Sequence, residues 1–249
     1  MKKNWLFATF ALFLLNACKE NKSGMVLSSM IIFDSTEKRF DTTSFISRNG
    51  RLASIIEKYQ VIDSLTYDEK GRLTGYKWQE VLTNETISKC SIQYGNDVAT
   101  KTDIPVGHFG DQTVTAYKLS KGLPVSKYLQ HGVTRDTIIY TYDKEGDLIK
   151  MMETTYLNGQ SFSQQRKMAY SSDCYQPFST LGDQLFWELV YQNPGLGARK
   201  LQISNGVLST TTVIEKQGKL PLKVTTMEMV DAQMPTPKNS SIQFVYTNQ

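Results

Sequence analysis

The sequence predicts an all-β fold: a long antiparallel meander, curved into an open sheet or a barrel, with one packed helix near residues 179–191. Three observations support this prediction. Turn signals recur about every 10–14 residues between residues 50 and 159. The runs between them are rich in β-branched and aromatic residues, and only one later segment has helical spacing. The length of 249 residues suits one large β domain.

The turns share a motif. Tyr-Asp-x-x-Gly-x-Leu occurs at residues 67–73 and again at 142–148, each time between two β-rich runs. The aspartate side chain can cap such a turn, and the glycine supplies the positive φ that the turn needs. Less complete copies with Asn-Gly, Lys-Gly or Gln-Gly surround residues 49–52, 121–123, 205–208 and 217–220. This repetition predicts consecutive antiparallel hairpins.

The runs between the turns have the chemistry of strands. Residues 137–142 and 209–214 are almost entirely β-branched, aromatic or hydroxyl-bearing. In residues 241–246, Ile242, Phe244 and Tyr246 share one face of the run. Many runs carry threonine or polar residues on one face, which is typical of a sheet that is wet on one side.

Residues 179–191 break this pattern and predict a helix. Ser179 or Thr180 is expected to cap its start, and the sequence at 193–195 (Asn-Pro-Gly) ends it. A lone apolar stripe in a β protein needs a sheet to cover, so we expect the helix to pack on the concave side. The apolar residues at helical spacing are Leu181, Leu185, Phe186, Leu189 and Val190.

Residues 1–17 have the features of a secretory signal peptide. Two lysines precede an apolar run over 5–15, which is too short to cross about 30 Å of hydrocarbon as a helix. The run ends in Leu-Asn-Ala-Cys, which resembles the lipobox of bacterial lipoproteins, although Asn16 stands where a small residue is usual. The resemblance implies cleavage after Ala17 and lipidation of Cys18. The alternative is an ordinary signal peptide followed by an incidental cysteine.

The expected mature chain is nearly neutral. Removal of residues 1–17 leaves 232 residues and lowers the formal net charge from +4 to +2. Charge therefore gives no reason to expect a nucleic-acid partner. We expect residues 18–29 to hold the lipidated cysteine and its tether, and 30–249 to form a single β-rich domain. The expected location is the outer membrane, through the lipid anchor, on the periplasmic face or at the cell surface. The sequence does not indicate an oligomeric state.

Few residues are available for catalysis or metal binding. His108 and His131 are the two histidines, and no zinc, phosphate-loop or nucleophile-elbow motif is present. We therefore expect no catalytic residues, no metal and no cofactor, while a triad assembled across the fold stays open. Asp68 and Asp143 lie inside the turn motifs, where capping explains them.

The two cysteines that remain after lipidation are Cys90 and Cys174. They lie in unrelated segments of the sequence. Outside the cytoplasm they can form a disulfide, and the alternative is a pair of buried free thiols.

Aromatic residues are the candidate ligand-binding groups. Tyr76 and Trp78 share a face of one predicted strand, and Tyr140 and Tyr142 share a face of another. Such rows on an open sheet can stack on sugar rings or hold lipid or peptide. The alternative is cross-strand packing within the core, which β proteins use routinely.

The turn motifs, the lipobox and the helix followed by residues 193–201 (Asn-Pro-Gly-Leu-Gly-Ala-Arg-Lys-Leu) resemble a family of Bacteroidota lipoproteins of unknown function with a porin-like fold. The resemblance covers roughly residues 30–249. It implies a strongly curved antiparallel sheet and brings no activity with it. The tyrosine-aspartate repeats of large secreted toxins contain similar hairpins, but in longer and more regular arrays.

These observations favour a non-catalytic binding or accessory module anchored to the outer membrane, with a glycan, peptide or lipid ligand. A lipid or lipoprotein carrier, whose curved sheet encloses acyl chains, is the second hypothesis, and a hydrolase with an unrecognised site is the third. A deep apolar cavity would favour the carrier, an exposed aromatic row the binding module, and a buried histidine–carboxylate pair in a cleft the enzyme.

Overall fold

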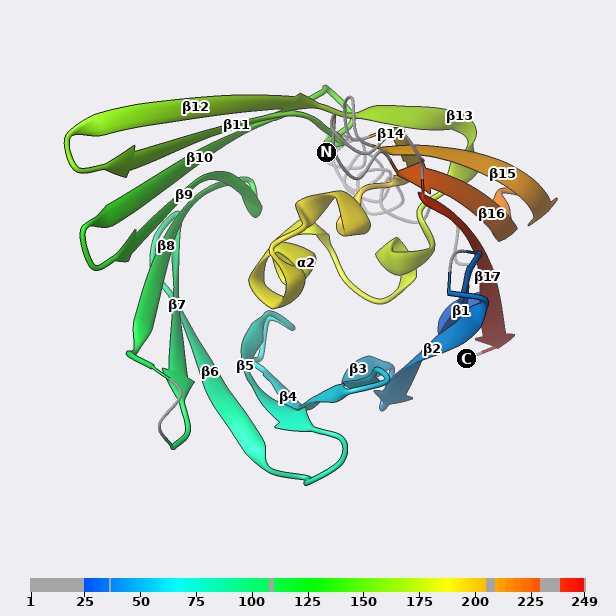
Figure 1. Cartoon of the computed structure of the whole chain (residues 1–249), viewed down its shortest axis with the longest axis horizontal. Coiled ribbons are helices and arrows are strands. Elements are labelled where there is room, and N and C mark those ends of the chain that lie inside the picture. Colours follow the sequence, from blue (N-terminus) through cyan, green and yellow to red (C-terminus); the bar gives the residue numbers. More distant parts are fainter. Residues whose placement is uncertain (1–24, 36, 108–109, 205–208, 229–237, 249) are drawn as a thin grey trace, which may run out of the picture.

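The computed structural model describes residues 25–35, 37–107, 110–204, 209–228 and 238–248. Within them, one 17-stranded antiparallel sheet curves into a nearly closed barrel around a short helical segment (Figure 1). Strand β1 pairs with both β2 and β17, so the two ends of the described chain lie side by side in the wall. The predicted all-β meander with a strongly curved sheet and one packed helix is confirmed.

The wall is built almost entirely from neighbours in sequence. Its strands are β1 (Met25–Asp34), β2 (Arg39–Arg48), β3 (Arg51–Ile56), β4 (Gln60–Tyr67), β5 (Leu73–Glu80), β6 (Thr86–Tyr94), β7 (Val98–Pro105), β8 (Thr113–Ser120), β9 (Leu123–His131), β10 (Thr134–Tyr142), β11 (Leu148–Leu157), β12 (Gln160–Lys167), β13 (Ala169–Tyr175), β14 (Lys200–Ser204), β15 (Ser209–Gln217), β16 (Leu220–Glu228) and β17 (Lys238–Asn248). Strand β1 begins within the segment 18–29 that was expected to be tether, because its apolar residues pair with β17 from Met25 onward.

The strand pairing in the wall changes at Met168. Only Met168 separates β12 from β13, yet β12 pairs with β11 and β13 pairs with β14. All eight residues of β12 are exposed. In Figure 1, β10, β11 and β12 accordingly extend outward from the rest of the barrel.

One end of the barrel, here called the entry rim, collects the motif turns. Met25, at the start of β1, pairs with Asn248. The register between β1 and β2 places the start of β1 beside the end of β2, and therefore beside the β2–β3 turn at 49–50. Because the strands alternate in direction, the turns at 68–72 and 143–147 lie at this end as well. The chain thus enters the barrel beside these turns.

Both complete copies of the motif form the predicted turn. The Asp68 carboxylate accepts the Arg72 N–H at 2.8 Å, and Asp143 Oδ1 accepts the N–H groups of Glu145 and Asp147. Gly71 and Gly146 have φ values of +80° and +89°, a region that side chains disfavour. The motif is therefore a capped turn that requires its glycine.

The tyrosines near this rim have a role that the pattern did not reveal. Each reaches across to a neighbouring hairpin and donates its hydroxyl to a backbone carbonyl near the start of a strand. The burial that accompanies these bonds raises the pKa of Tyr67 to about 12 and moves the others upward too. The pairs are Tyr67 to Leu52, Tyr94 to Leu73, Tyr142 to Pro124, Tyr170 to Leu148 and Tyr246 to Pro221.

Residues 176–199, here called the plug, fill the inside of the barrel. They contain two 3-10 turns, η1 (Pro177–Thr180) and η2 (Pro194–Gly197), on either side of helix α2 (Gln184–Tyr191). Figure 1 shows the plug surrounded by the curved wall. The expected position on the concave side of the sheet is confirmed.

The predicted helix cap, Ser179 or Thr180, lay three or four residues before the observed cap, Asp183. The helix begins at Gln184, because Asp183 accepts the Phe186 N–H at 2.8 Å and is the N-cap. Thr180, an expected cap, instead accepts the N–H of Leu27 in the wall. Gly182 allows this break, since a Cβ there would lie 2.5 Å from the Phe186 ring.

The plug supplies much of the core. Leu185, Phe186 and Leu189 are buried, as predicted, and Trp187 and Val190 are buried beside them. They pack with wall residues of β1 to β8 and β17 in one cluster that includes Leu27, Phe45, Ile55, Ile62, Tyr117 and Phe244. The interior of the barrel is thus filled by a segment of the same chain.

Candidate functional site

A pocket of about 220 Å³ opens at the entry rim between the wall and the plug. Its floor is apolar, made by buried leucines of β3 and β5 and by Phe186 of α2. Its sides are polar. The charged and aromatic residues that line it are Arg51, Tyr67, Lys70, Arg72, Tyr94 and Asp183.

Two arginines lie over two tyrosines in this pocket. The Arg51 guanidinium carbon is 5.5 Å from the centre of the Tyr67 ring, and that of Arg72 is 4.0 Å from the centre of the Tyr94 ring. Both tyrosine hydroxyls are fixed by backbone carbonyls of the next hairpin. The cations therefore rest on fixed aromatic surfaces, which pre-orders long and flexible side chains.

The charge of the pocket is positive. Arg72 is neutralised by Asp68, whose Oδ2 lies 2.6 Å from Nη2. Within the described chain, no ion pair involves Arg51 or Lys70, and both are exposed. The lining carboxylate, Asp183, is engaged as the helix cap. Two cations are thus available to a ligand.

A buried ion pair joins the plug to the opposite wall. Lys127 of β9 and Glu188 of α2 are 4% and 1% exposed, and Lys127 Nζ lies 3.4 Å from Glu188 Oε1. Lys127 also donates to Gln192 Oε1 at 2.6 Å. Burial raises the pKa of Glu188, and the Lys127 ammonium opposes that rise. The pair fixes the orientation of α2 by charge as well as by packing.

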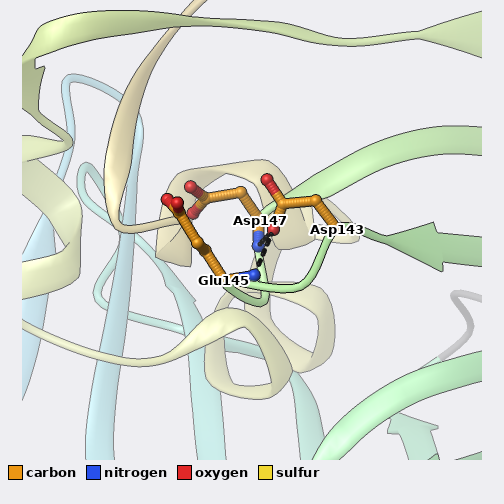
Figure 2. A group of neighbouring side chains, drawn as sticks. All are labelled: Asp143, Glu145 and Asp147. Atoms are coloured by element: carbon orange, nitrogen blue, oxygen red, sulfur yellow. Dashed lines mark hydrogen bonds between the residues drawn. The ribbon is translucent and has the colours of Figure 1, made fainter.

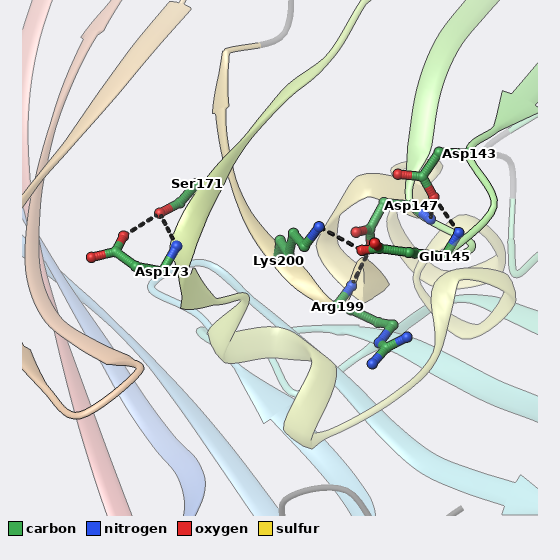
Figure 3. A network of polar contacts seen from close by, with 7 residues as sticks. All are labelled: Asp143, Glu145, Asp147, Ser171, Asp173, Arg199 and Lys200. Atoms are coloured by element: carbon green, nitrogen blue, oxygen red, sulfur yellow. Dashed lines mark hydrogen bonds and ion pairs between the residues drawn. The ribbon is translucent and has the colours of Figure 1, made fainter. Parts of the chain in front are cut away.

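A third polar feature is the turn at 143–147. The carboxylates of Asp143, Glu145 and Asp147 each place an oxygen within 4.8 Å of the other two (Figure 2). Lys200 Nζ lies 2.5 Å from Glu145 Oε2, and the Arg199 N–H donates to Asp147 Oδ1 at 2.7 Å (Figure 3). Oxygen-rich clusters of this kind are the type of site that hard cations prefer.

The four predicted aromatic binding residues surround the plug. Tyr76 is 3% exposed and donates its hydroxyl to the Leu189 carbonyl at 2.9 Å. Trp78 packs edge-on against Tyr191 of the plug. Tyr140 is 4% exposed, and the Tyr142 hydroxyl donates to the Pro124 carbonyl at 2.6 Å.

This placement corrects the expectation of an open stacking face. Tyr76 and Trp78 pack with plug residues in the main core cluster. Tyr140 and Tyr142 pack in a second, smaller cluster with Ile138 and Leu148. The core-packing alternative explains them.

The other predicted site residues are placed as follows. Cys90 and Cys174 are buried free thiols, so the disulfide alternative is corrected. Cys18 and His108 lie outside the described residues, and the side chain of His131 does so too. Among the residues that the structure describes, no helix is both long and apolar enough to cross a membrane.

A short repeated sequence, Gly-Arg-Leu, marks the two turns that supply the arginines of the pocket. Gly-Arg-Leu occurs at 50–52 and again at 71–73, in each case directly after a turn. These two turns are neighbours at the entry rim, so both arginines reach one cavity. In the motif turn at 143–147, the residue that follows the glycine is Asp147.

No protein-family model matches the sequence, and no curated protein is similar to it. The chain is similar to two crystal structures of porin-like proteins. One, from Bacteroides uniformis, is 13% identical, with coverage of 89% of this chain and 98% of that one and a TM-score of 0.42. The other, from Bacteroides vulgatus, is 12% identical, with coverage of 90% and 100% and a TM-score of 0.42.

Proposed function

We propose that this chain is a non-catalytic binding module, anchored outside the cytoplasm by a lipid on Cys18, and that the entry-rim pocket holds a small anionic ligand. The observation that supports the proposal best is the pair Arg51 and Lys70, two cations that line one cavity and have no ion-pair partner among the described residues. A cation held over an aromatic ring and facing a cavity is well suited to bind a carboxylate or phosphate.

The size of the pocket limits the ligand. About 220 Å³ is less than the roughly 300–1,000 Å³ of sites for drug-sized molecules. A single acidic sugar unit or a similar small anion fits this volume. The apolar floor formed by Leu52, Leu73 and Phe186 gives the uncharged part of such a ligand a surface to contact.

The contents of the barrel favour a binding module over a lipid carrier. A carrier with a curved sheet needs interior volume for acyl chains. Here the interior holds the plug, whose Trp187 and Leu189 are fully buried against the wall. An acyl chain could enter only if the plug left, and this would break the Lys127–Glu188 pair.

Loss of the unpaired cations should weaken anion binding. We expect Arg51→Gln and Lys70→Gln each to lower the affinity for glucuronate by about tenfold, since a hydrogen bond to a charged group contributes roughly 1.5–3 kcal/mol. Calorimetric titration at low salt measures this, with inorganic phosphate as a second probe and neutral glucose as a third. Lys89→Gln, an exposed lysine of β6, is the matched control. Equal binding by glucose and glucuronate, or equal loss in the control, would refute the anion site.

The anchor is tested separately. We expect Cys18→Ala to release the chain from membranes or to leave the signal segment uncleaved, because the thiol that accepts the lipid is gone. Membrane fractionation and mass measurement of the mature chain show either result. Lys19→Ala, which changes the next residue, should fractionate like the unchanged protein. A Cys18→Ala chain that matures normally and stays on membranes contradicts the anchor.

If the anchor holds, the pocket lies close to the membrane. Six residues lie between Cys18 and Met25 at the entry rim, so seven residue-to-residue steps join them. Fully extended, they reach about 23–25 Å. The pocket opens at that same rim, so the proposed ligand is one that approaches the barrel from its anchored end.

A further inference from the structure

The turn at 143–147 differs from its sister turn at 68–72 on both sides of the glycine, where Glu145 and Asp147 replace Lys70 and Arg72. In the sister turn, Arg72 follows the glycine, and its guanidinium neutralises Asp68. In the second turn that place is taken by Asp147, so an acid replaces the built-in cation. The same backbone turn therefore carries its own counter-charge in one copy and a concentration of carboxylates in the other.

Asp147 also has an unsatisfied oxygen. The residue is fully buried, and its Oδ1 accepts the Arg199 N–H at 2.7 Å. Its Oδ2 is buried with no hydrogen-bond partner among the described residues. A buried carboxylate oxygen without a partner is costly, and a metal ion is one group that would satisfy it. Figure 2 shows the carboxylates of Asp143, Glu145 and Asp147 gathered around the turn.

The surrounding charges leave room for a divalent cation. Three carboxylates face one another, and Lys200 is paired with Glu145 at 2.5 Å. Lys144 is exposed within the same turn, and Arg199 approaches through its backbone N–H. The three acids are thus only partly neutralised by the ammonium of Lys200.

The donor set favours Ca²⁺ over Mg²⁺. Three carboxylates offer one oxygen each, all within 4.8 Å of one another. Ca²⁺ accepts six to eight oxygen ligands in flexible geometry, whereas Mg²⁺ usually keeps several waters and binds only one or two carboxylates.

We propose that Asp143, Glu145 and Asp147 bind Ca²⁺ and that the ion fastens the plug to the entry rim. The turn already touches the plug at two places. The Gly146 carbonyl accepts a hydrogen bond from the Gln184 side chain at the start of α2. Asp147 accepts the N–H of Arg199, where the plug ends (Figure 3). An ion here would join the β10–β11 hairpin to both. This inference is independent of the entry-rim pocket and of the lipid anchor.

The test is Ca²⁺ binding to the full chain after treatment with a chelator. Titration calorimetry should show one saturable site, with a dissociation constant of about 10⁻⁴–10⁻³ M, the range of extracellular calcium modules. At about 10 mM Ca²⁺ the unfolding temperature should rise by roughly 3–10 °C. Mg²⁺ should give a weaker signal.

Four variants identify the site. Glu145→Gln, at an exposed position that does not threaten folding, should weaken Ca²⁺ binding by about tenfold. Lys200→Gln should tighten it several-fold, because the competing ammonium is removed. Glu69→Gln removes the same charge from the sister turn and should leave binding unchanged. Asp147→Asn, where it folds, should behave as Glu145→Gln does.

The proposal fails if the unchanged chain shows no saturable binding up to about 10 mM Ca²⁺, well above the range of extracellular modules. It also fails if Glu145→Gln and Glu69→Gln bind equally. A purely structural Glu145–Lys200 ion pair predicts that Lys200→Gln leaves Ca²⁺ affinity unchanged, so that result overturns it too.

Discussion

Replacement of Lys127 by methionine is expected to destabilise the chain by about 3–5 kcal/mol, because it leaves Glu188 charged and buried without its partner. Glu188 is 1% exposed, and within the described structure neither of its carboxylate oxygens has a hydrogen-bond partner. Lys101, another ammonium whose charge acts on Glu188, lies 3.1 Å from Asp103. The loss would be a large part of the roughly 5–15 kcal/mol that stabilises a typical domain. Urea unfolding measures it.

Two further variants separate the charge from the packing. The double variant Lys127→Met with Glu188→Gln removes both charges and should recover most of the stability, because a buried ion pair contributes little compared with neutral groups of similar size. Lys118→Met, an exposed lysine on neighbouring β8, should change the unfolding free energy by less than about 0.5 kcal/mol. A double variant as unstable as Lys127→Met alone would show that packing, not charge, explains the effect.

The pH dependence follows from the direction of the Glu188 shift. Burial raises the pKa of this carboxyl, and removal of Lys127 removes the main group that opposes the rise. In the Lys127→Met chain, Glu188 therefore takes up a proton at higher pH than in the unchanged chain. Protonation removes the buried charge, so the stability deficit should shrink as the pH falls from about 8 to about 5. A deficit that does not vary over this interval would contradict an ionised Glu188.

The sequence was sufficient to predict the barrel wall, because the wall is built from local rules. Each hairpin depends on a capping aspartate, a glycine at positive φ and two adjacent β-rich runs, and all of these are neighbours in sequence. Asp68 and Gly71 behave as their positions predict. The curved meander follows once such hairpins are joined in order.

The candidate sites were not predictable in the same way, because they depend on contacts between distant segments. Arg51 and Arg72 share a pocket only because the plug closes it from residues 181–186. Glu188 meets Lys127 across 61 positions of sequence, and helical spacing alone placed Glu188 off the apolar stripe. Sequence motifs describe residues that are close in the sequence, so they do not predict contacts between distant segments.

The aromatic residues failed as ligand candidates for a related reason. A strand has two faces, and alternation shows which side chains share a face but not which face is covered. Tyr76 is covered by the plug, which comes from residues 176–199, and Tyr140 is buried in a second cluster with Ile138 and Leu148. The helix start also shifted, since Asp183 caps better than Thr180 once Thr180 bonds the wall.

Truncation of Trp187 to alanine is expected to cost about 3–5 kcal/mol, because it empties the centre of the plug. Trp187 is fully buried and contacts three other rings, with centroids 5.4 Å away at Phe178, 5.0 Å at Phe186 and 5.8 Å at Tyr191. Its indole N–H donates to the Phe178 and Gly182 carbonyls, at 3.1 and 3.2 Å. The loss of both packing and hydrogen bonds makes this one of the most costly truncations in the chain.

The same measurement decides whether the plug is structural or a detachable arm that binds a partner. If the plug is part of the core, Trp187→Ala and Phe186→Ala both lower the urea midpoint, while Phe162→Ala, at a 60% exposed ring on β12, leaves it unchanged. An arm that leaves the barrel to bind a partner would behave in the opposite way, with wild-type midpoints for the plug variants and loss of association. Because the plug rings pack against β1 to β8 and β17, their truncation should weaken the whole wall, and a single cooperative transition should move to lower urea.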